Sequence, residues 1–363
     1  MNQPLASPHI AGPMNIQRVM VLVLLALLPG TAMGIFEFGW PALFLFLITI
    51  GSAVLFEAIS LMLAGKPVRA HCFDHSALVT GWLLAMTLPP WAPWWIGVLG
   101  SFCAIVIGKH VFGGIGQNVF NPAMLARSIL LVSFPLEMTT WISPRPFGAD
   151  QAPGIAQGWG ITMQGVENLD AVSSASVLGH VRTELGRGES LPDILISTYD
   201  PMLSAVGIVN GSLGETSALL FLLGGIFLIF KRVITWHIPV AMLGTVTLMA
   251  TTFSLLDPNH YAGPLFHLLN GGLMLGAFFI ATDPVTSPSS NQGKLLFGIG
   301  CGMLVFIIRN WGGYPEGMAF AVLLMNATTP LIDHYIKPRI YGYSSSSRLL
   351  SFIKGLKREK SDG

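Results

Sequence analysis

The sequence predicts an all-α polytopic membrane protein with about ten transmembrane helices. Of its 363 residues, 52% are hydrophobic and only 10% are charged, whereas soluble domains are about 25% charged. The mean hydropathy is +0.64, and the apolar segments repeatedly reach the length that a helix needs to cross a bilayer. A soluble chain of this length would need a charged surface, which this composition cannot supply.

The apolar segments give the order of the predicted helices. Candidate spans are 19–36, 41–64, 75–89, 94–108, 121–135, 215–230, 234–254, 263–282, 295–308 and 316–333. The first span follows Arg18 and a second comes at once, so we expect a retained helix and not a cleaved signal. Segments 121–135 and 295–308 are short for a full crossing, and short segments often form half-helices that line a site.

The long polar stretch at 137–214 is predicted to be an extramembrane insertion. Four aromatic residues are candidates for packing it down; they are Trp141, Phe147, Trp159 and Tyr199. The short loops on the side of the N-terminus carry Arg18, Lys66, Arg69, Lys109, Lys231, Arg232 and Lys294, and Arg309 is essentially the one basic residue in the opposite loops. The positive-inside rule then gives a cytoplasmic N-terminus at 1–18, membrane halves at 19–136 and 215–333, a periplasmic insertion, and a basic cytoplasmic tail at 334–363.

Charge and cysteine content exclude several functions. The net charge of +1 and the lack of a basic-aromatic patch argue against nucleic-acid binding. Cys72, Cys103 and Cys301 lie far apart without the spacing of a metal, cluster or disulfide motif, and the latter two fall in apolar segments where we expect simple packing. Neither a metal ligand set nor a catalytic residue is predicted.

Two features repeat within the chain. Segments 81–89 and 276–284 both contain a Gly, an apolar run, a Thr, one further residue and a Pro, and Lys109 and Arg309 each precede a Gly-Gly pair at a similar offset. A duplication would explain both matches; chance similarity between apolar segments is the alternative. With about five spans in each half, the second copy would be inverted in the membrane.

The densest motif, Gly-Gly-Ile-Gly-Gln-Asn-Val-Phe-Asn-Pro-Ala, occupies residues 113–123. Glycines allow close approach of backbone or ligand, and Asn121-Pro122 is a favourable N-cap and first helical position. The motif predicts a loop that leads into a helix at Asn121. Irregular backbone at membrane depth is tolerated where it lines a cavity. The Asn-Pro-Ala triplet alone also fits a channel half-helix or a plain tight turn.

The motif Gly-Lys-x-x-Phe-Gly-Gly-Ile-Gly-Gln-Asn-x-Phe-Asn-Pro-Ala at 108–123 resembles the signature of the RnfD/NqrB subunits of ion-translocating electron-transport complexes. Segments 211–217, 281–288 and 309–317 also match, so the resemblance runs from the first span to Asp333. Chain size and the short N-terminal region favour the RnfD branch. The resemblance implies a urea/ammonium-channel-like fold of two inverted five-helix repeats with half-helices.

The resemblance also implies covalent FMN, joined through its phosphate to a hydroxyl side chain in a motif close to Asp-x-x-Ser/Thr-Gly-Ala-Thr. Here the matching stretch starts at Asp170, includes Ser173, Ala175 and Leu178, and has Ser176 at the flavin-bearing position. Ser174 and Ser176 depart from the usual Gly and Thr. A phosphoester needs only a hydroxyl oxygen, so the second change keeps the essential group, whereas the first matters if that residue needs a positive φ.

A non-covalent, riboflavin-like flavin is a further implication of the family, near 113–118 or around 310–317. Candidate flavin-pocket residues are Gly113, Gly114, Gly116, Asn118, Asn121, Glu215 and Thr216. Intramembrane ionisable residues are functional candidates by default; here they are Glu57, Arg127, Glu215, His267 and Asp283. Glu215 is expected to cap its helix or to bind a flavin, and Arg127 to anchor a phosphate or to extend to the cytoplasmic interface.

Two functions remain open from the sequence. The first is a flavoprotein subunit of an Rnf-type translocase in the bacterial inner membrane, which moves Na⁺ or H⁺ and works beside the FMN subunit RnfG and the iron-sulfur and NADH-side subunits. The chain itself shows no nicotinamide motif. The second is a solute channel or transporter on the same fold without redox chemistry. Bound flavin that survives denaturation would distinguish the first from the second.

Overall fold

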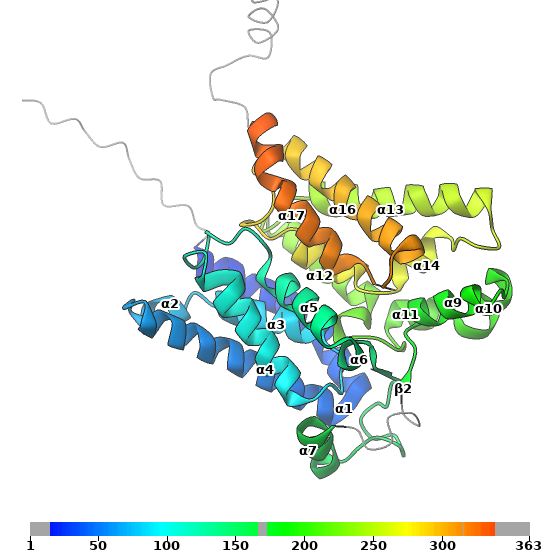
Figure 1. Cartoon of the computed structure of the whole chain (residues 1–363), viewed down its shortest axis with the longest axis horizontal. Helices are drawn as coiled ribbons and strands as arrows, with labels where there is room; N and C mark the ends of the chain where they lie inside the picture. Colours follow the sequence, from blue (N-terminus) through cyan, green and yellow to red (C-terminus); the bar gives the residue numbers. More distant parts are fainter. Residues whose placement is uncertain (1–14, 166–172, 315, 338–363) are drawn as a thin grey trace, which may run out of the picture.

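The computed structural model describes residues 15–165, 173–314 and 316–337. Figure 1 shows the helices of the N-terminal part, drawn in blue to teal, on one side of the molecule and those of the C-terminal part, drawn in yellow to orange, on the other. The green segments of the insertion extend from one end of this assembly. The described chain is therefore mainly helical.

The N-terminal group begins with α1 (Ile16–Leu63), which is broken at Gly39, where φ is 74° and ψ is −156°. This break falls between the predicted spans 19–36 and 41–64 and confirms the division. After α2 (Val68–Cys72) come α3 (Ser76–Thr87), α4 (Trp94–Phe102), the π-helix η1 (Cys103–His110) and α5 (Pro122–Ser133). As predicted, α5 is short, and Asn121 caps it: its Oδ1 accepts hydrogen bonds from the N–H groups of Ala123 and Met124 at 3.1 and 3.2 Å.

The insertion consists of short elements. They are α6 (Pro135–Thr139), β1 (Trp141–Ile142), α7 (Ile155–Gln164), β2 (Ser173–Ser174), α9 (Val177–Gly186), α10 (Leu191–Thr198), α11 (Pro201–Val206) and the 3₁₀ turn η2 (Leu213–Glu215). β1 and β2 pair antiparallel. The predicted aromatic anchors do pack: Phe147 lies against Trp40, Trp159 against Phe44, Tyr199 against Phe266, and Trp141 is buried.

The C-terminal group contains α12 (Ala218–Phe230), α13 (His237–Leu256), α14 (Pro264–Leu269), α15 (Leu273–Leu275), the π-helix η3 (Gly276–Ile280), α16 (Asn291–Trp311) and α17 (Met318–Tyr335). Two predictions are wrong here. Segment 263–282 is not one span, because the helix stops at Leu269 and Gly271 adopts a φ of 73°. Segment 295–308 is not short, because α16 has 21 residues.

Three helices, α1, α13 and α16, are long and apolar enough to cross a membrane. Ser76–Thr87, Trp94–His110, Pro122–Ser133 and Ala218–Phe230 are shorter apolar helices. Together these apolar helices are those of a polytopic membrane protein. Large apolar side chains such as Leu55, Leu248 and Leu331 remain exposed on them, as expected for a surface that faces lipid.

One apolar core joins the two groups. It includes Leu27 and Leu84 from the first group and Phe221 and Phe297 from the second, all of them fully buried. Cys103 and Cys301 belong to the same core as free cysteines, which confirms their predicted packing role. Because α12 packs on α1 and α17 packs on α5, the cavities between the groups are bounded by helices from both.

Candidate functional site

The predicted flavin-bearing serine lies at the start of α9. Ser176 is the N-cap of this helix, and its Oγ accepts a hydrogen bond from the N–H of Gly179 at 3.1 Å. Its exposed fraction is 6%, and Val177, Leu178 and Val181 bury one face of α9 in a small apolar cluster with Phe266. The free N–H groups at a helix N-terminus favour an anion, so the hydroxyl lies where a phosphate group would be stabilised.

Beside α9 lies a cavity of about 320 Å³, which we call the insertion cavity. Its wall includes Leu178, Arg182, Tyr261, His267, Arg309 and Trp311. The volume reaches the lower end of the range of about 300–1,000 Å³ that is usual for small-molecule sites. Leu178 comes from the predicted flavinylation motif, so the motif and the cavity share a wall.

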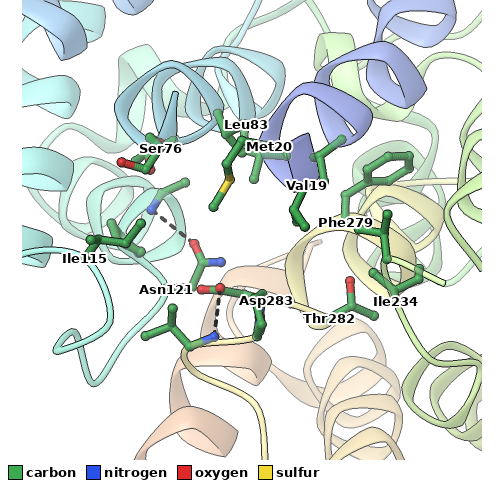
Figure 2. Close-up of a pocket in the computed structure, with 18 of the residues that line it drawn as sticks. Val19, Met20, Ser76, Leu83, Ile115, Asn121, Ile234, Phe279, Thr282 and Asp283 are labelled. Carbon is green, nitrogen blue, oxygen red and sulfur yellow. Dashed lines mark hydrogen bonds between the residues drawn. The ribbon is translucent and has the colours of Figure 1, made fainter. Parts of the chain in front are cut away.

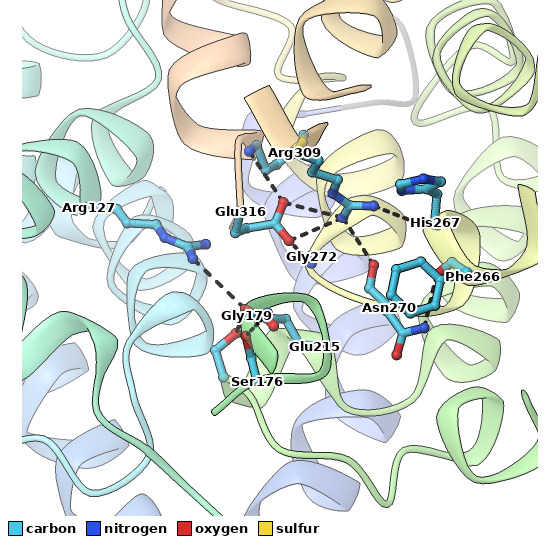
Figure 3. A network of polar contacts seen from close by, with 12 residues as sticks. Arg127, Ser176, Gly179, Glu215, Phe266, His267, Asn270, Gly272, Arg309 and Glu316 are labelled. Atoms are coloured by element: carbon cyan, nitrogen blue, oxygen red, sulfur yellow. Dashed lines mark hydrogen bonds and ion pairs between the residues drawn. The ribbon is translucent and has the colours of Figure 1, made fainter. Parts of the chain in front are cut away.

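The deep wall of the insertion cavity is a buried polar network around Arg309 (Figure 3). Arg309 Nη1 donates to the carbonyl of His267 at 2.7 Å, and Nη2 donates to the carbonyl of Asn270 at 3.0 Å and to Glu316 Oε2 at 3.1 Å. Among the described residues, Arg309 Nε and both ring nitrogens of His267 have no hydrogen-bond partner although they are buried. Buried unpaired polar atoms are costly, so they indicate a place where a polar ligand would bind.

A second guanidinium group stands at the same cavity. Arg182 of α9 donates through Nη1 to the carbonyl of Tyr314 at 3.2 Å and through Nη2 to the carbonyl of Gly312. This contact ties α9 to the loop after α16. Segment 310–317, one of the two predicted flavin regions, therefore borders the insertion cavity, and Asn310 and Trp311 line it.

The rest of the flavinylation motif is partly described. Asp170 lies outside the described residues. Ser173 and Ser174 form β2 and pair with Ile142 and Trp141, so position 174 has extended backbone and does not need the positive φ of a glycine. Ala175 is exposed, and its carbonyl accepts a hydrogen bond from Asn210 Nδ2 at 3.3 Å. The motif is thus joined to the segment that leads into 211–217.

Glu215 and Thr216 lie close to this junction, but their roles differ from those predicted. Glu215 does not cap α12, because Ser217 is the N-cap and accepts from the N–H of Leu220. Glu215 instead accepts from Ser212 Oγ at 2.9 Å and lies 3.9 Å from Arg127 Nη2 (Figure 3). Thr216 is fully buried and donates to the carbonyl of Leu213. The prediction that Arg127 extends to the interface is wrong, since the side chain is 7% exposed and faces Glu215.

The glycine-rich motif borders a different cavity, of about 100 Å³, which we call the interhelical cavity. Figure 2 shows Ser76, Asn121 and Asp283 around it, together with apolar side chains of α1, α3 and η3. Its wall also includes Lys109, Ile115 and Asn118. Asp283 accepts from the N–H of Val285 and from Thr286 Oγ1. The cavity lies between the N-terminal and C-terminal groups.

The glycines of the motif are required by backbone conformation. Gly113, Gly114 and Gly116 have φ values of 115°, 106° and 86°, a region that L side chains rarely adopt. Asn118 Nδ2 donates to the carbonyl of Phe120 at 3.2 Å, which closes the loop ahead of α5. Of the predicted flavin-pocket residues, Asn118 and Asn121 line the cavity, whereas the three glycines shape the loop.

Sequence reasoning missed one polar cluster at this cavity. Lys109 Nζ lies 2.8 Å from Glu57 Oε1 and donates to Ser76 Oγ at 2.8 Å. The assignment of Lys109 and Arg309 to loops is wrong, since their exposed fractions are 3% and 6%. The available signal was the apolar context on the N-terminal side of each residue, where a basic side chain needs a buried partner.

Comparison with known proteins gives close relatives over nearly the whole chain. A model described as the NQR2, RnfD, RnfE family matches residues 5–342. The chain is 52% identical over 342 residues to a protein of Halorhodospira halophila named as the RnfD component of an ion-translocating oxidoreductase complex, and the match covers 94% of this chain and 96% of that one. It is 54% identical over 346 residues to the protein of the same name from Stutzerimonas stutzeri (95% and 98% covered) and 43% identical over 349 residues to that of Escherichia coli (93% and 97% covered).

Proposed function

Because the chain belongs to the NQR2, RnfD, RnfE family, we propose that it is the membrane flavoprotein subunit of an Rnf-type complex. This complex couples electron transfer to the movement of Na⁺ or H⁺ across the bacterial inner membrane. The relatives named as components of an ion-translocating oxidoreductase complex support the assignment, since they match this chain over nearly its whole length.

The subunit carries FMN as a phosphoester on Ser176 Oγ. The observation that carries this proposal is the position of Ser176 at the N-terminus of α9, beside a cavity with unpaired buried donors. In the ester, Oγ keeps its acceptor position toward Gly179, and the phosphate oxygens gain the free N–H groups of the first turn. Because Ser176 is 6% exposed, the transferase must reach it before α9 packs against α14.

The flavin ring occupies the insertion cavity. Arg309 Nε and the ring nitrogens of His267 supply hydrogen bonds to its polar edge, and Tyr261 and Trp311 supply aromatic surface for its faces. When bound, FMN accepts and donates electrons singly or in pairs. The protein holds the ring, satisfies its polar atoms and restricts the access of water.

The remaining features of the proposal concern arrangement. The two groups of helices are inverted repeats, supported by the equivalent places of Lys109 and Arg309 at the ends of η1 and α16 and by the following short helices α5 and α17. Both termini are cytoplasmic and the insertion is periplasmic, where it meets the FMN subunit RnfG; the iron-sulfur and NADH-side subunits complete the complex. A second, riboflavin-like flavin near 113–118 requires the interhelical cavity of about 100 Å³ to widen.

Flavin fluorescence after denaturing electrophoresis tests the attachment. The parent chain and Ser176→Thr should give a fluorescent band, because both carry a hydroxyl, and Ser176→Ala should give none. Ser174→Gly is the matched control: it restores the usual family residue two positions away and should keep the band. Fluorescence on Ser176→Ala would overturn the assignment. A colourless parent protein would instead favour the solute channel or transporter.

A further inference from the structure

A chain of hydrogen bonds leads from the protein surface to the interhelical cavity. Lys109 Nζ donates to Ser76 Oγ at 2.8 Å, and Ser76 Oγ donates to Asp74 Oδ1 at 2.6 Å. The ammonium group can only donate and a carboxylate can only accept, so the hydroxyl between them must do both. Asp74 is half-buried at the surface, whereas Ser76 and Lys109 both line the cavity.

The charges around Lys109 are unbalanced. Glu57 Oε1 lies 2.8 Å from its Nζ, and Glu57 Oε2 lies 3.0 Å from His110 Nε2. With Asp74 at the end of the chain, two carboxylates face one ammonium group, so the cluster has a negative surplus that favours the uptake of a proton. Other titratable groups nearby are Cys72, which is within electrostatic range of Glu57, Asp74 and Lys109, and Asp283, which lines the same cavity.

Stability does not explain this cluster. Glu57 and Lys109 are 2% and 3% exposed, and a buried ion pair of this kind is often no more stabilising than apolar residues of similar size. Ionisable groups inside a membrane protein are more often part of a path for ions or protons. The cavity of about 100 Å³ is smaller than usual small-molecule sites, of about 300–1,000 Å³, yet it exceeds the roughly 10–15 Å³ that one water needs.

We propose that Asp74, Ser76 and Lys109 form a proton path into the interhelical cavity, in which Glu57 and His110 position Lys109. The path rests on the proposed function and specifies it, because it makes the proton an ion that this subunit handles. Lys109 releases a proton to water in the cavity and becomes a neutral amine. The amine takes the proton of Ser76 Oγ, Ser76 takes one from protonated Asp74, and solvent reprotonates Asp74. Each transfer breaks one N–H or O–H bond and forms another, and no electrons move.

The test compares Ser76→Ala with Ser76→Thr in the purified complex, reconstituted in proteoliposomes that contain the pH dye pyranine. Reduced methyl viologen supplies electrons and NAD⁺ accepts them. Ser76→Thr keeps a hydroxyl and should move protons at nearly the parent rate. Ser76→Ala breaks the path and should lower proton movement per electron roughly tenfold or more, in line with the loss of a positioned proton-transfer group.

Asp74→Asn is the second variant, placed at the half-buried surface where it disturbs packing least. It should slow proton movement and raise the solvent deuterium isotope effect, and it keeps the test decisive if Ser76→Ala fails to assemble. Equal proton movement in Ser76→Ala, Asp74→Asn and the parent would overturn the path, as would Na⁺ movement unaffected by any variant. The covalent flavin band separates the two proposals: its absence from the parent complex refutes the flavin assignment, whereas its presence with unchanged proton movement refutes the path alone.

Discussion

Asn121 and Asn326 join the two groups of helices from the start of one short helix to the middle of another. The backbone N–H of Asn121 donates to Asn326 Oδ1 at 3.1 Å, across 205 residues of sequence. Asn326 Nδ2 donates in turn to the carbonyl of Thr286 at 3.1 Å. Both asparagines are buried, at 3% and 1% exposed. One amide side chain thus satisfies the N-terminal loop of α5 and the loop after η3.

Asn326→Ala should destabilise the protein because it leaves a buried N–H and a buried carbonyl unpaired. We expect a loss of about 1–3 kcal/mol for each unsatisfied group, measured as thermal unfolding in detergent. Asn259→Ala is the control, since Asn259 is exposed and should change the free energy of unfolding by less than about 0.5 kcal/mol. Similar midpoints for the two variants would contradict the proposed importance of this contact.

Gly302→Ala should weaken the packing of α16 on α13. A Cβ at Gly302 would lie 2.5 Å from the carbonyl oxygen of Met242, a backbone atom that cannot turn aside. We expect a loss of about 1–3 kcal/mol, as for other overpacked cores. Gly244 lies on α13 with no atom within 4 Å of its Cβ position, so Gly244→Ala should be neutral or stabilise the helix by up to about 1 kcal/mol. Paired thermal unfolding curves would show opposite signs.

Arg309→Met should cost about 3–5 kcal/mol, because it leaves the Glu316 carboxylate buried without its cation. Adding Glu316→Gln should recover part of this loss, since a neutral amide does not require a counter-charge. A double-mutant cycle by thermal unfolding measures the coupling. Strictly additive losses would show that the two side chains act independently.

Tyr199→Phe should be neutral or slightly stabilising. The Tyr199 hydroxyl is buried without a partner among the described residues, while the ring stacks edge-on against Phe266 at 5.3 Å. Removing an unpaired hydroxyl keeps the ring contact and removes a desolvation cost. Tyr199→Ala, which loses the ring, should cost about 3 kcal/mol. Thermal unfolding of both variants tests the difference, and equal losses would contradict it.

The same residue gives a pH prediction. Burial, and after it the charge of Asp200, raises the pKa of Tyr199 above its ordinary value. The unfolded chain then loses this proton first, at a pH of about 10, so the contribution of Tyr199 to stability is complete below that pH and falls as the pH rises further. Tyr199→Phe should remove this part of the alkaline loss, which unfolding measured at a series of pH values would detect.

The sequence predicted the helical elements well where one local rule was sufficient. The length of the apolar runs located α1, α3, α13 and α17, and Asn121-Pro122 gave the start of α5, because a cap and a fixed φ act within one turn. The break inside 263–282 escaped prediction because it depends on Gly271, whose Cβ position is occupied by Glu316 and Arg309. These two residues lie far along the chain, so no local pattern reports their proximity.

Candidate site residues divide in the same way. Motif similarity indicated Ser176 and the 113–123 loop, but their separation into two cavities depends on how α9 packs beside α14 and how α5 meets α17. Lys109 and Arg309 looked like loop charges because each precedes a Gly-Gly pair. Their partners, Glu57 and Glu316, are brought to them by helix packing and by the turn before α17.

By itself, the sequence determined that this chain is a polytopic membrane protein and a relative of the RnfD/NqrB subunits, because apolar length, charge content and contiguous motifs are properties of the chain alone. Only the tertiary structure decided which polar groups are buried together: Arg309 with Glu316 and His267, Lys109 with Glu57 and Ser76, and Asn121 with Asn326. The physical reason is that a polar group between apolar helices must find its partner wherever the packing provides one.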